Sequence, residues 1–198
     1  PRSRRLDVFI APPLSVINRW SVRLFNAVYH RAPAAAHAVV DYEPFFYPLD
    51  AVSRWNRIYG PRGFFQFQCV VPPEVGEDAM RELLTQIGDH GEASFLVVLK
   101  EFGDLPSPGL LSFPRAGPTL ALDFPNRGSS TLRLLETLER ITMEAGGALY
   151  PAKDACMSPE SFRGSYPRWE ELERRRDPAY VSDFWCRVTG IEPSGGST

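Results

Sequence analysis

Lysine is scarce in this chain of 198 residues: only Lys100 and Lys153 stand among 22 basic residues, and the others are all arginine. Cysteine and histidine are also rare, at three each, and the cysteines lack the C-x-x-C spacing of metal sites. A disulfide framework and a zinc site are therefore not expected. We expect no metal, and a reducing cytoplasm is the default compartment.

Long uncharged runs are missing too, since none reaches the roughly 18 residues that a membrane span needs. The net charge of −2 argues against nucleic acid as a partner. The opening PRSRRLDVFIAPPL has no Met, and its prolines interrupt the short apolar stretch, so it is a poor signal peptide. We expect a fragment of a longer protein, located in the cytoplasm either free or at the membrane periphery.

Hydrophobic periodicity divides the chain into predicted elements. Helices are predicted at 14–30, 50–59, 77–91, 129–147, after Ser158 and at 166–178, and strands at 64–71, 94–102, 118–124 and 148–150. Over residues 64–150 the order is β-α-β-β-α-β, which is the ferredoxin-like split unit. The predicted fold class is α+β: an antiparallel sheet with both long helices on one face, and helical extensions at both ends.

Four regions follow from these elements. Residues 1–62 are predicted to form an N-terminal helix and a connecting segment, and 63–151 the ferredoxin-like core. Residues 152–190 are predicted to form a C-terminal helical segment, and 191–198 read as a disordered tail.

Strand alternation predicts which side chains face away from the helices. The apolar sets, which include Phe67, Leu99 and Leu122, should bury against the helices. The other face then carries mixed polar and apolar residues: Gln66, Gln68, Lys100 and Thr119, with Leu96, Val98 and Ala121. Such a face suits a ligand floor or a domain interface. The alternative is an ordinary solvated sheet face, which antiparallel sheets often have.

Lys153 follows the last predicted strand and precedes the helix that starts at Ser158, so we expect it on a short loop at a strand end. In a chain that otherwise uses arginine, a lysine offers a compact charge whose pKa falls on burial. It could therefore trade protons or hold charge beside a reacting group. The alternative is a surface lysine paired with Asp154.

Several stretches of the chain resemble FAD-linked sugar oxidases. They are FFYPLDAVSRWNRIYGPRGFFQFQCVVP, SFLVVLKEFG, LLSFPRAGPTLALDFP and GGALYPAKDACMSPESFRGSYPRWEELERRRDP. The resemblance is to the decaprenylphosphoryl-β-D-ribose 2-oxidase type and, more distantly, to the aldonolactone oxidases, within the vanillyl-alcohol-oxidase-like flavoproteins. It covers roughly residues 14–190 in order, and only the C-terminal, substrate-binding half of that family.

The resemblance implies roles for individual residues. Gln66 and Gln68 match the glutamines of the family's G-F-x-Q-F/Y-Q block, which line the substrate pocket. Lys100 matches the lysine of its S-F-L-x-V-x-K strand, also in the pocket. Trp55 and Arg57 match the W-N-R piece of the pocket wall.

The Y-x-A-K-D segment of the family is matched by Tyr150 and Lys153, and its lysine sits beside the flavin and the reacting carbon. Lys153 is therefore the predicted catalytic and cofactor-contacting residue, and Tyr150 a substrate contact.

The chain departs from the family pattern at two places that bear on the substrate. Thr119 and Ala121 stand where members acting on lipid-linked ribose have Asn and Cys, and Tyr150-Pro151 replaces the His-Trp pair of aldonolactone oxidases.

The resemblance thus implies the substrate domain of an FAD-dependent oxidoreductase that oxidises a secondary alcohol of a sugar-like substrate, lipid-linked or free. FAD would be held mainly by an N-terminal FAD-binding domain of the same polypeptide, toward which residues 152–190 would pack. The sequence contains no glycine-rich phosphate loop, so this chain alone should be inactive. The alternatives are a free-standing ferredoxin-like ligand sensor and a protein-interaction module.

Overall fold

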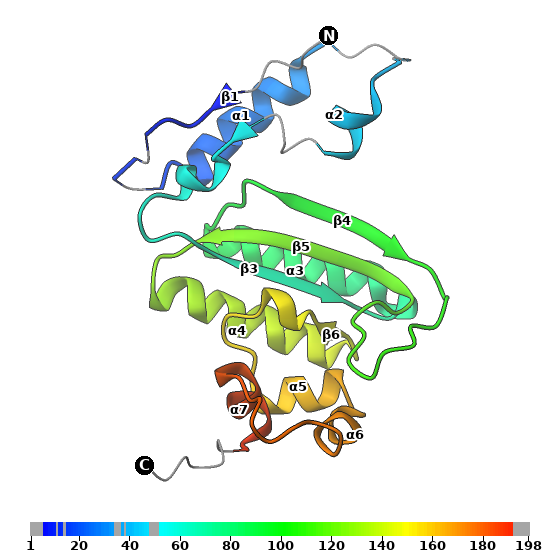
Figure 1. Cartoon of the computed structure of the whole chain (residues 1–198). Helices are drawn as coiled ribbons and strands as arrows, with labels where there is room; N and C mark the ends of the chain where they lie inside the picture. The colour runs from blue at the N-terminus through cyan, green and yellow to red at the C-terminus, as the bar shows by residue number, and fades with distance from the viewer. Residues whose placement is uncertain are drawn as a thin grey trace.

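A four-stranded antiparallel sheet forms the centre of the computed structural model, which describes residues 6–10, 12–13, 15–33, 37, 39–47 and 52–191. The strands lie in the order β4-β5-β3-β6 (Figure 1). Their bounds are Phe64–Val70 for β3, Val97–Phe102 for β4, Gly117–Pro125 for β5 and Ala148–Leu149 for β6.

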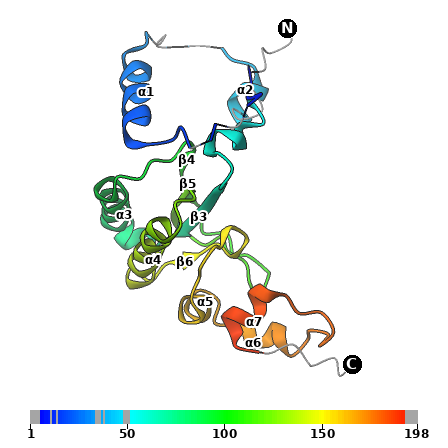
Figure 2. The same ribbon diagram turned by 90° about the vertical axis from the view of Figure 1, so that its left-hand side faces the viewer.

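Two long helices, α3 (Gly76–His90) and α4 (Ser129–Glu144), connect these strands and pack against each other. Both lie on the same side of the sheet, as Figure 2 shows in a view along its edge. The chain order β3-α3-β4-β5-α4-β6 is the one predicted from periodicity. The α+β class and the position of the two long helices are confirmed.

The main hydrophobic core lies between this sheet and the helices. It takes every second residue of β3 and β5, and the apolar stripes of α3 and α4. Its most deeply buried members include Cys69, Leu83, Leu120, Leu134, Leu138 and Phe124. Alternation in the strands and the 3.6-residue period in the helices therefore place the core as predicted.

The prediction of burial was wrong for the apolar set of β4. Val97 and Leu99 face the helix side, because they pair with Leu122 and Leu120, yet they are 51% and 59% exposed. The reason is that β4 is the edge strand and α3 packs over β5 instead. A groove of about 650 Å³ remains between α3 and β4.

The N-terminal region differs from its prediction in detail. Helix α1 (Arg19–Arg31) begins after the N-cap Asn18, and Leu14 lies outside the described residues. Helical periodicity over 14–30 places Ile17, Leu24 and Val28 on one apolar face, yet Ile17 precedes the helix and is buried, whereas Leu24 and Val28 are exposed. The other elements here are β1 (Leu6–Asp7), α2 (Tyr42–Phe46), β2 (Val52–Ser53), and the 3-10 helix η2 (Trp55–Tyr59) within the predicted helix at 50–59.

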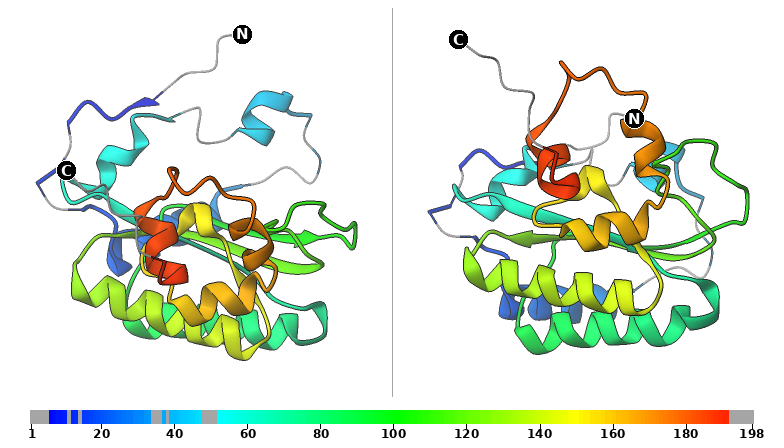
Figure 3. Two further views of the ribbon diagram at one scale, coloured as in Figure 1. Left: turned by 60° about the horizontal axis from the view of Figure 1, so that its bottom comes forward. Right: turned by 90° about the horizontal axis from the view of Figure 1, so that it is seen from below.

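After β6 the chain forms short helices that group beside α4 and β6 (Figure 3). They are the 3-10 helix η4 (Pro151–Lys153), α5 (Pro159–Ser165), α6 (Trp169–Glu173) and α7 (Asp183–Thr189); a further 3-10 helix, η3 (Pro73–Val75), precedes α3. Ser158 caps α5 as predicted, accepting from the backbone of Ser161. The helix predicted at 166–178 is shorter, and the predicted tail beyond residue 191 lies outside the described residues.

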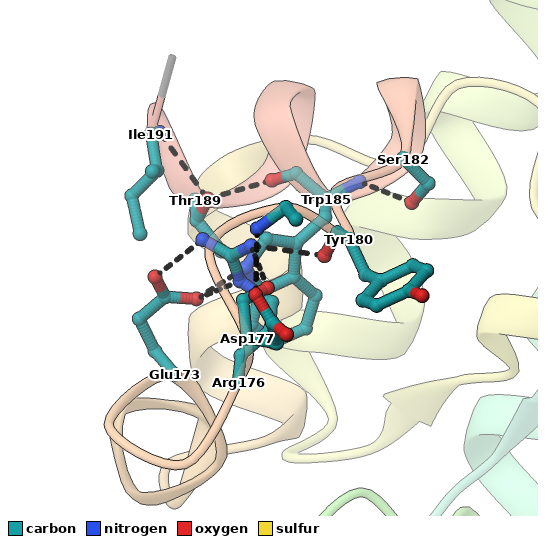
Figure 4. Close-up of polar contacts among 9 residues, drawn as sticks. Glu173, Arg176, Asp177, Tyr180, Ser182, Trp185, Thr189 and Ile191 are labelled. Atoms are coloured by element: carbon teal, nitrogen blue, oxygen red, sulfur yellow. Dashed lines mark hydrogen bonds and ion pairs between the residues drawn. The ribbon is translucent and has the colours of Figure 1, made fainter. Parts of the chain in front are cut away.

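A cluster of polar contacts joins α6 to α7 (Figure 4). The Glu173 carboxylate accepts two hydrogen bonds of 2.8 Å from Arg176 and one of 2.7 Å from the Trp185 indole N–H. Arg176 also donates to the carbonyl oxygens of Asp177 and Tyr180. Because Trp185 is buried in the main core, the cluster fixes α6 and the following turn to the domain.

Candidate functional site

The sheet face opposite α3 and α4 carries the predicted polar set. Residues directly opposite in antiparallel strands share a face, and the register pairs Gln66 with Asp123, Gln68 with Ala121, and Lys100 with Thr119. The predicted sharing of this face by Gln66, Gln68, Lys100 and Thr119 is confirmed. We call it the open face.

Aromatic side chains bound the open face at both ends of β3. At its start, Phe64 packs against Trp55 and Tyr59 from η2, with ring centroids 5.5 and 4.6 Å apart. At its end, Tyr150 stacks on Phe113 at 4.7 Å. The glutamines therefore lie on a polar strip between two aromatic clusters.

Gln66 is bound across the strip to a buried carboxylate. Its Nε2 donates to Oδ1 of Asp123 at 3.0 Å, and Asp123 is only 2% exposed. The second oxygen, Oδ2, is buried and has no hydrogen-bond partner among the described residues. Burial raises the pKa of Asp123, while the Gln66 hydrogen bond and the charge of Lys153 oppose that shift.

Gln68 is bound in the same manner to a buried hydroxyl. Its Nε2 donates to Oγ1 of Thr119 at 3.2 Å, and that hydroxyl donates to the carbonyl oxygen of Cys69 at 2.7 Å. Thr119 is 1% exposed, so the whole chain of bonds lies against the sheet.

Lys153 ends η4, directly after β6 and Tyr150, and is half-buried. Burial is the main cause that lowers the pKa of Lys153; Lys100 adds to it, and Asp123 opposes it. The alternative pairing with Asp154 is wrong, because the Asp154 carboxylate forms its ion pair with Arg187. Among charged groups, the Asp123 carboxylate on the open face has the largest effect on the pKa of Lys153.

A small cavity joins four of the predicted residues. It measures about 20 Å³, and Gln66, Gln68, Tyr150 and Lys153 contribute to its lining. That volume holds about one water molecule. The rest of its lining includes Phe67 and the α4 residues Leu135 and Glu139, so the cavity lies where the open face meets the helix side of the sheet. The two amides, the Tyr150 ring and the Lys153 side chain stand together at this edge of the open face.

The other predicted residues lie outside this cavity. Lys100 is exposed on the edge strand β4, with Thr119 between it and β3. Trp55 belongs to the aromatic cluster at the start of β3, and Arg57 donates to the carbonyl oxygens of Val8 and Phe9 at 3.3 and 2.7 Å. The structure therefore does not gather all seven substrate-binding candidates around Lys153.

Asp123 was absent from the candidate residues predicted from sequence. Alternation along the predicted strand at 118–124 puts Asp123 on the same face as Thr119 and Ala121, and a carboxylate within an apolar strand was the available signal. Its importance depends on burial, which the sequence does not show.

The described part of the chain lacks two kinds of feature. No group of three or more His, Cys, Asp and Glu side chains gathers there in a way that could hold a metal ion. Nor is any helix among those residues long and apolar enough to cross a membrane.

Fold and site together define an α+β domain whose helix-backed antiparallel sheet presents a polar strip and a strand-end lysine. No family model matches the chain. It is 37% identical over 188 residues to decaprenylphosphoryl-beta-D-ribose oxidase of Mycolicibacterium smegmatis (strain ATCC 700084 / mc(2)155), which covers 92% of this chain and 40% of that protein. The resemblance to an oxidase of this type is confirmed for the matched part.

A second relative comes from Streptomyces coelicolor and is described as "Uncharacterized protein in mprA 5'region". The identity is 36% over 131 residues, covering 64% of this chain and 35% of that protein. The chain thus spans well under half the length of both relatives. At the level that these comparisons show, the chain is similar to one part of an oxidase.

Proposed function

We propose that the chain is the substrate-binding domain of an FAD-dependent oxidoreductase that oxidises a secondary alcohol of a sugar-like substrate. The observation that carries the proposal is the cavity shared by Gln66, Gln68, Tyr150 and Lys153. The similarity of nearly the whole chain to part of an oxidase supports it. Because the cavity itself holds only about one water molecule, the sugar would lie over its mouth on the open face, against the two amides and the Tyr150 ring.

FAD is the cofactor in this proposal, held mainly by an FAD-binding domain of the same polypeptide. When bound, it supplies the acceptor for the hydride of the alcohol carbon. Lys153 fits such a neighbour, because its ammonium group has no ion-pair partner among the described residues and is half-buried. A cation there would stabilise negative charge that develops during oxidation.

The chain's own residues would bind and orient the substrate. Gln66 and Gln68 offer hydrogen-bonding groups at consecutive same-face positions of β3, and Tyr150 forms a wall that Phe113 holds in place. Lys153, with its lowered pKa, would hold or accept the proton that leaves the substrate hydroxyl. Lys100, Thr119, Trp55 and Arg57 would act in the wider pocket.

The partner in this proposal is the remaining part of the polypeptide. Helix α1 has no buried residue, and large apolar side chains stand exposed along it: Trp20, Leu24, Phe25, Val28 and Tyr29. Such a surface indicates an interface, and the part of the oxidase relative that this chain does not match leaves room for a covering domain. The alternative, a free-standing interaction domain, would use the same surface for another protein.

The test is anaerobic reduction of the complete polypeptide that carries this chain. Purified protein would be mixed with decaprenylphosphoryl-β-D-ribose or with simpler sugar alcohols, and its visible absorbance followed. We expect a flavin spectrum that bleaches on adding a substrate. A complete polypeptide with no flavin, or a flavin that no sugar alcohol reduces, would overturn the proposal.

A further inference from the structure

The orientation of the Gln66 amide is fixed by its partner. A side-chain amide can present either its NH₂ group or its oxygen, whereas an ionised carboxylate can only accept. Asp123 lies directly across the strand pair, 3.0 Å from Gln66 Nε2, and is almost wholly buried. With Asp123 Oδ1 as the acceptor, Gln66 turns its NH₂ group toward β5 and its Oε1 away from Asp123.

The orientation of Gln68 is fixed by a different route. The Thr119 hydroxyl has a single hydrogen, and the Cys69 carbonyl oxygen accepts it at 2.7 Å. Toward Gln68 the hydroxyl can then only accept, so the amide must present Nε2, at 3.2 Å. A carboxylate and a hydroxyl thus orient the two glutamine amides in the same way, each with Nε2 toward β5.

We propose that Asp123 and Thr119 are positioning residues that hold Gln66 and Gln68 with Nε2 against the sheet, so that both Oε1 atoms face the ligand and select hydroxyl hydrogens. This inference deepens the proposed function and depends on it for the identity of the ligand. Both glutamines are half-buried and line the cavity beside Lys153. We call Asp123 and Thr119 the two locks. Both lie on the neighbouring strand β5 and are buried below the surface that a ligand would touch.

The chemistry of the ligand follows from this polarity. Residues two apart on a strand project from the same face about 6.6 Å apart, so the two acceptors are spaced for separate hydroxyl groups of one sugar ring. A ligand hydroxyl donates to a glutamine oxygen, and its own oxygen remains available to the Lys153 ammonium group. An ether at the same position keeps its oxygen but has no hydrogen to donate.

The locks can be tested without any cofactor, by nuclear magnetic resonance on this 198-residue chain. The measured quantity is the exchange rate of the Gln66 and Gln68 side-chain amide hydrogens with water. We expect Thr119→Val to speed exchange at Gln68 about tenfold, the value of one hydrogen bond, and to leave Gln66 unchanged. Asp123→Asn should change Gln66 alone, because asparagine can donate as well as accept.

Thr119→Ser is the matched control, since it retains the hydroxyl and should keep Gln68 protected. A purely structural role for Thr119 and Asp123 would loosen both amides in either variant. That result, or unprotected amides in the unaltered chain, would overturn the proposal. Because each lock has its own variant, the loss of folding in one still leaves the other as a test.

The selection is tested by titrating the chain with methyl β-D-ribofuranoside and with its mono-O-methyl ethers. We expect the parent sugar to shift both amide resonances and to bind about tenfold more tightly than an ether that lacks a contacted hydrogen. Thr119→Val should remove the preference for the hydroxyl that Gln68 contacts and leave that for the hydroxyl that Gln66 contacts, whereas Thr119→Ser should retain both. Equal binding of sugar and ethers, or no shift by the sugar, would contradict selection by the two oxygens.

These measurements separate this inference from the proposed function. The amide polarity is read from exchange rates in the chain alone, whereas the oxidase proposal is read from flavin reduction in the complete polypeptide. If the amide hydrogens are protected as expected but no sugar alcohol reduces the flavin, the proposed oxidation is rejected and the proposed amide orientation is retained.

Discussion

Burial determines the chemistry of single residues on the open face. Lys153 and Asp123 belong to different elements, and burial is the first cause of the pKa shift in both. The shifts have opposite directions, because burial disfavours the charged form of a lysine and of a carboxylate alike. The charge of each group opposes the shift that burial causes in the pKa of the other. This interaction connects η4, which follows β6, to β5.

Replacing Lys153 by arginine tests whether the lysine itself is needed. Lys153→Arg keeps the charge but loses the compact size and the ability to titrate. In the complete enzyme we expect turnover to fall at least tenfold, about 1.4 kcal/mol of barrier. The pH profile should also lose a limb that lies below the ordinary lysine pKa of about 10.4. Turnover at saturating substrate is the measurement, and Arg174→Lys on the exposed side of the domain is the control.

Glycine at position 117 is required by the backbone. Gly117 opens β5 with φ of 124°, and an added Cβ would collide with the carbonyl oxygen of Val71. We expect Gly117→Ala to lower the free energy of unfolding by about 2 kcal/mol or more. Gly103→Ala is the matched control, because a Cβ there would meet nothing. Equal melting temperatures for the two variants would refute this account.

At the scale of elements, α3 shows how one helix serves two surfaces. Its neighbouring leucines, Leu83 and Leu84, point to the core and to the groove beside β4, with exposed fractions of 0% and 45%. The sequence pattern places both on the apolar side of the helix. Only the position of α3 over β5 separates them.

These two leucines give a paired prediction. Leu83→Ala removes a fully buried side chain and should cost about 2–5 kcal/mol of unfolding free energy. Leu84→Ala should cost less than about 1 kcal/mol, because its side chain is already partly in water. Chemical denaturation measures both. A larger loss for Leu84 would mean that the groove is covered in solution.

The connection of α6 to α7 should depend on pH through Glu173. Its hydrogen bonds from Arg176 and Trp185 lower the pKa of Glu173 against the opposing effect of desolvation. A lowered folded-state pKa gives stability that is present above the unfolded value, about 4.3, and is lost as pH falls through the folded value.

Glu173→Gln keeps the shape and removes this titration. We expect the melting temperature of the variant to be lower than that of the unaltered chain at neutral pH, and the difference to shrink below about pH 4. A difference that is constant across this range would show that the charge of Glu173 does not stabilise the α6–α7 connection.

At the scale of the whole molecule, apolar side chains are well buried in one part of the described chain and exposed in another. The sheet and its two long helices enclose a continuous core, whereas α1 exposes its apolar side chains to solvent. A domain that is part of a larger oxidase would bury such a helix against its neighbour. The proposed division of labour assigns substrate contacts to this chain and most cofactor contacts to the neighbour.

This division predicts that the chain alone binds no flavin and oxidises no sugar. The physical reason is the lack of a glycine-rich loop to hold the cofactor phosphates. Purified chain would be incubated with FAD and passed through a desalting column. A yellow protein with a flavin absorption band, or turnover by the chain alone, would contradict the prediction.

The sequence by itself determined the order of the core elements and the two faces of β3 and β5. Those features follow from local periodicity, because side chains alternate in a strand and recur every 3.6 residues in a helix. Alternation was enough to place Gln66 and Gln68 opposite Phe67 on β3.

Only the tertiary structure decided what depends on contacts between distant segments. It left Leu99 exposed at the sheet edge, gave Asp154 to Arg187 instead of Lys153, and buried Asp123 beneath Gln66. It also turned both glutamine amides the same way, through partners more than 50 residues away. Periodicity describes one element at a time, whereas burial and hydrogen-bond partners are set by how elements pack.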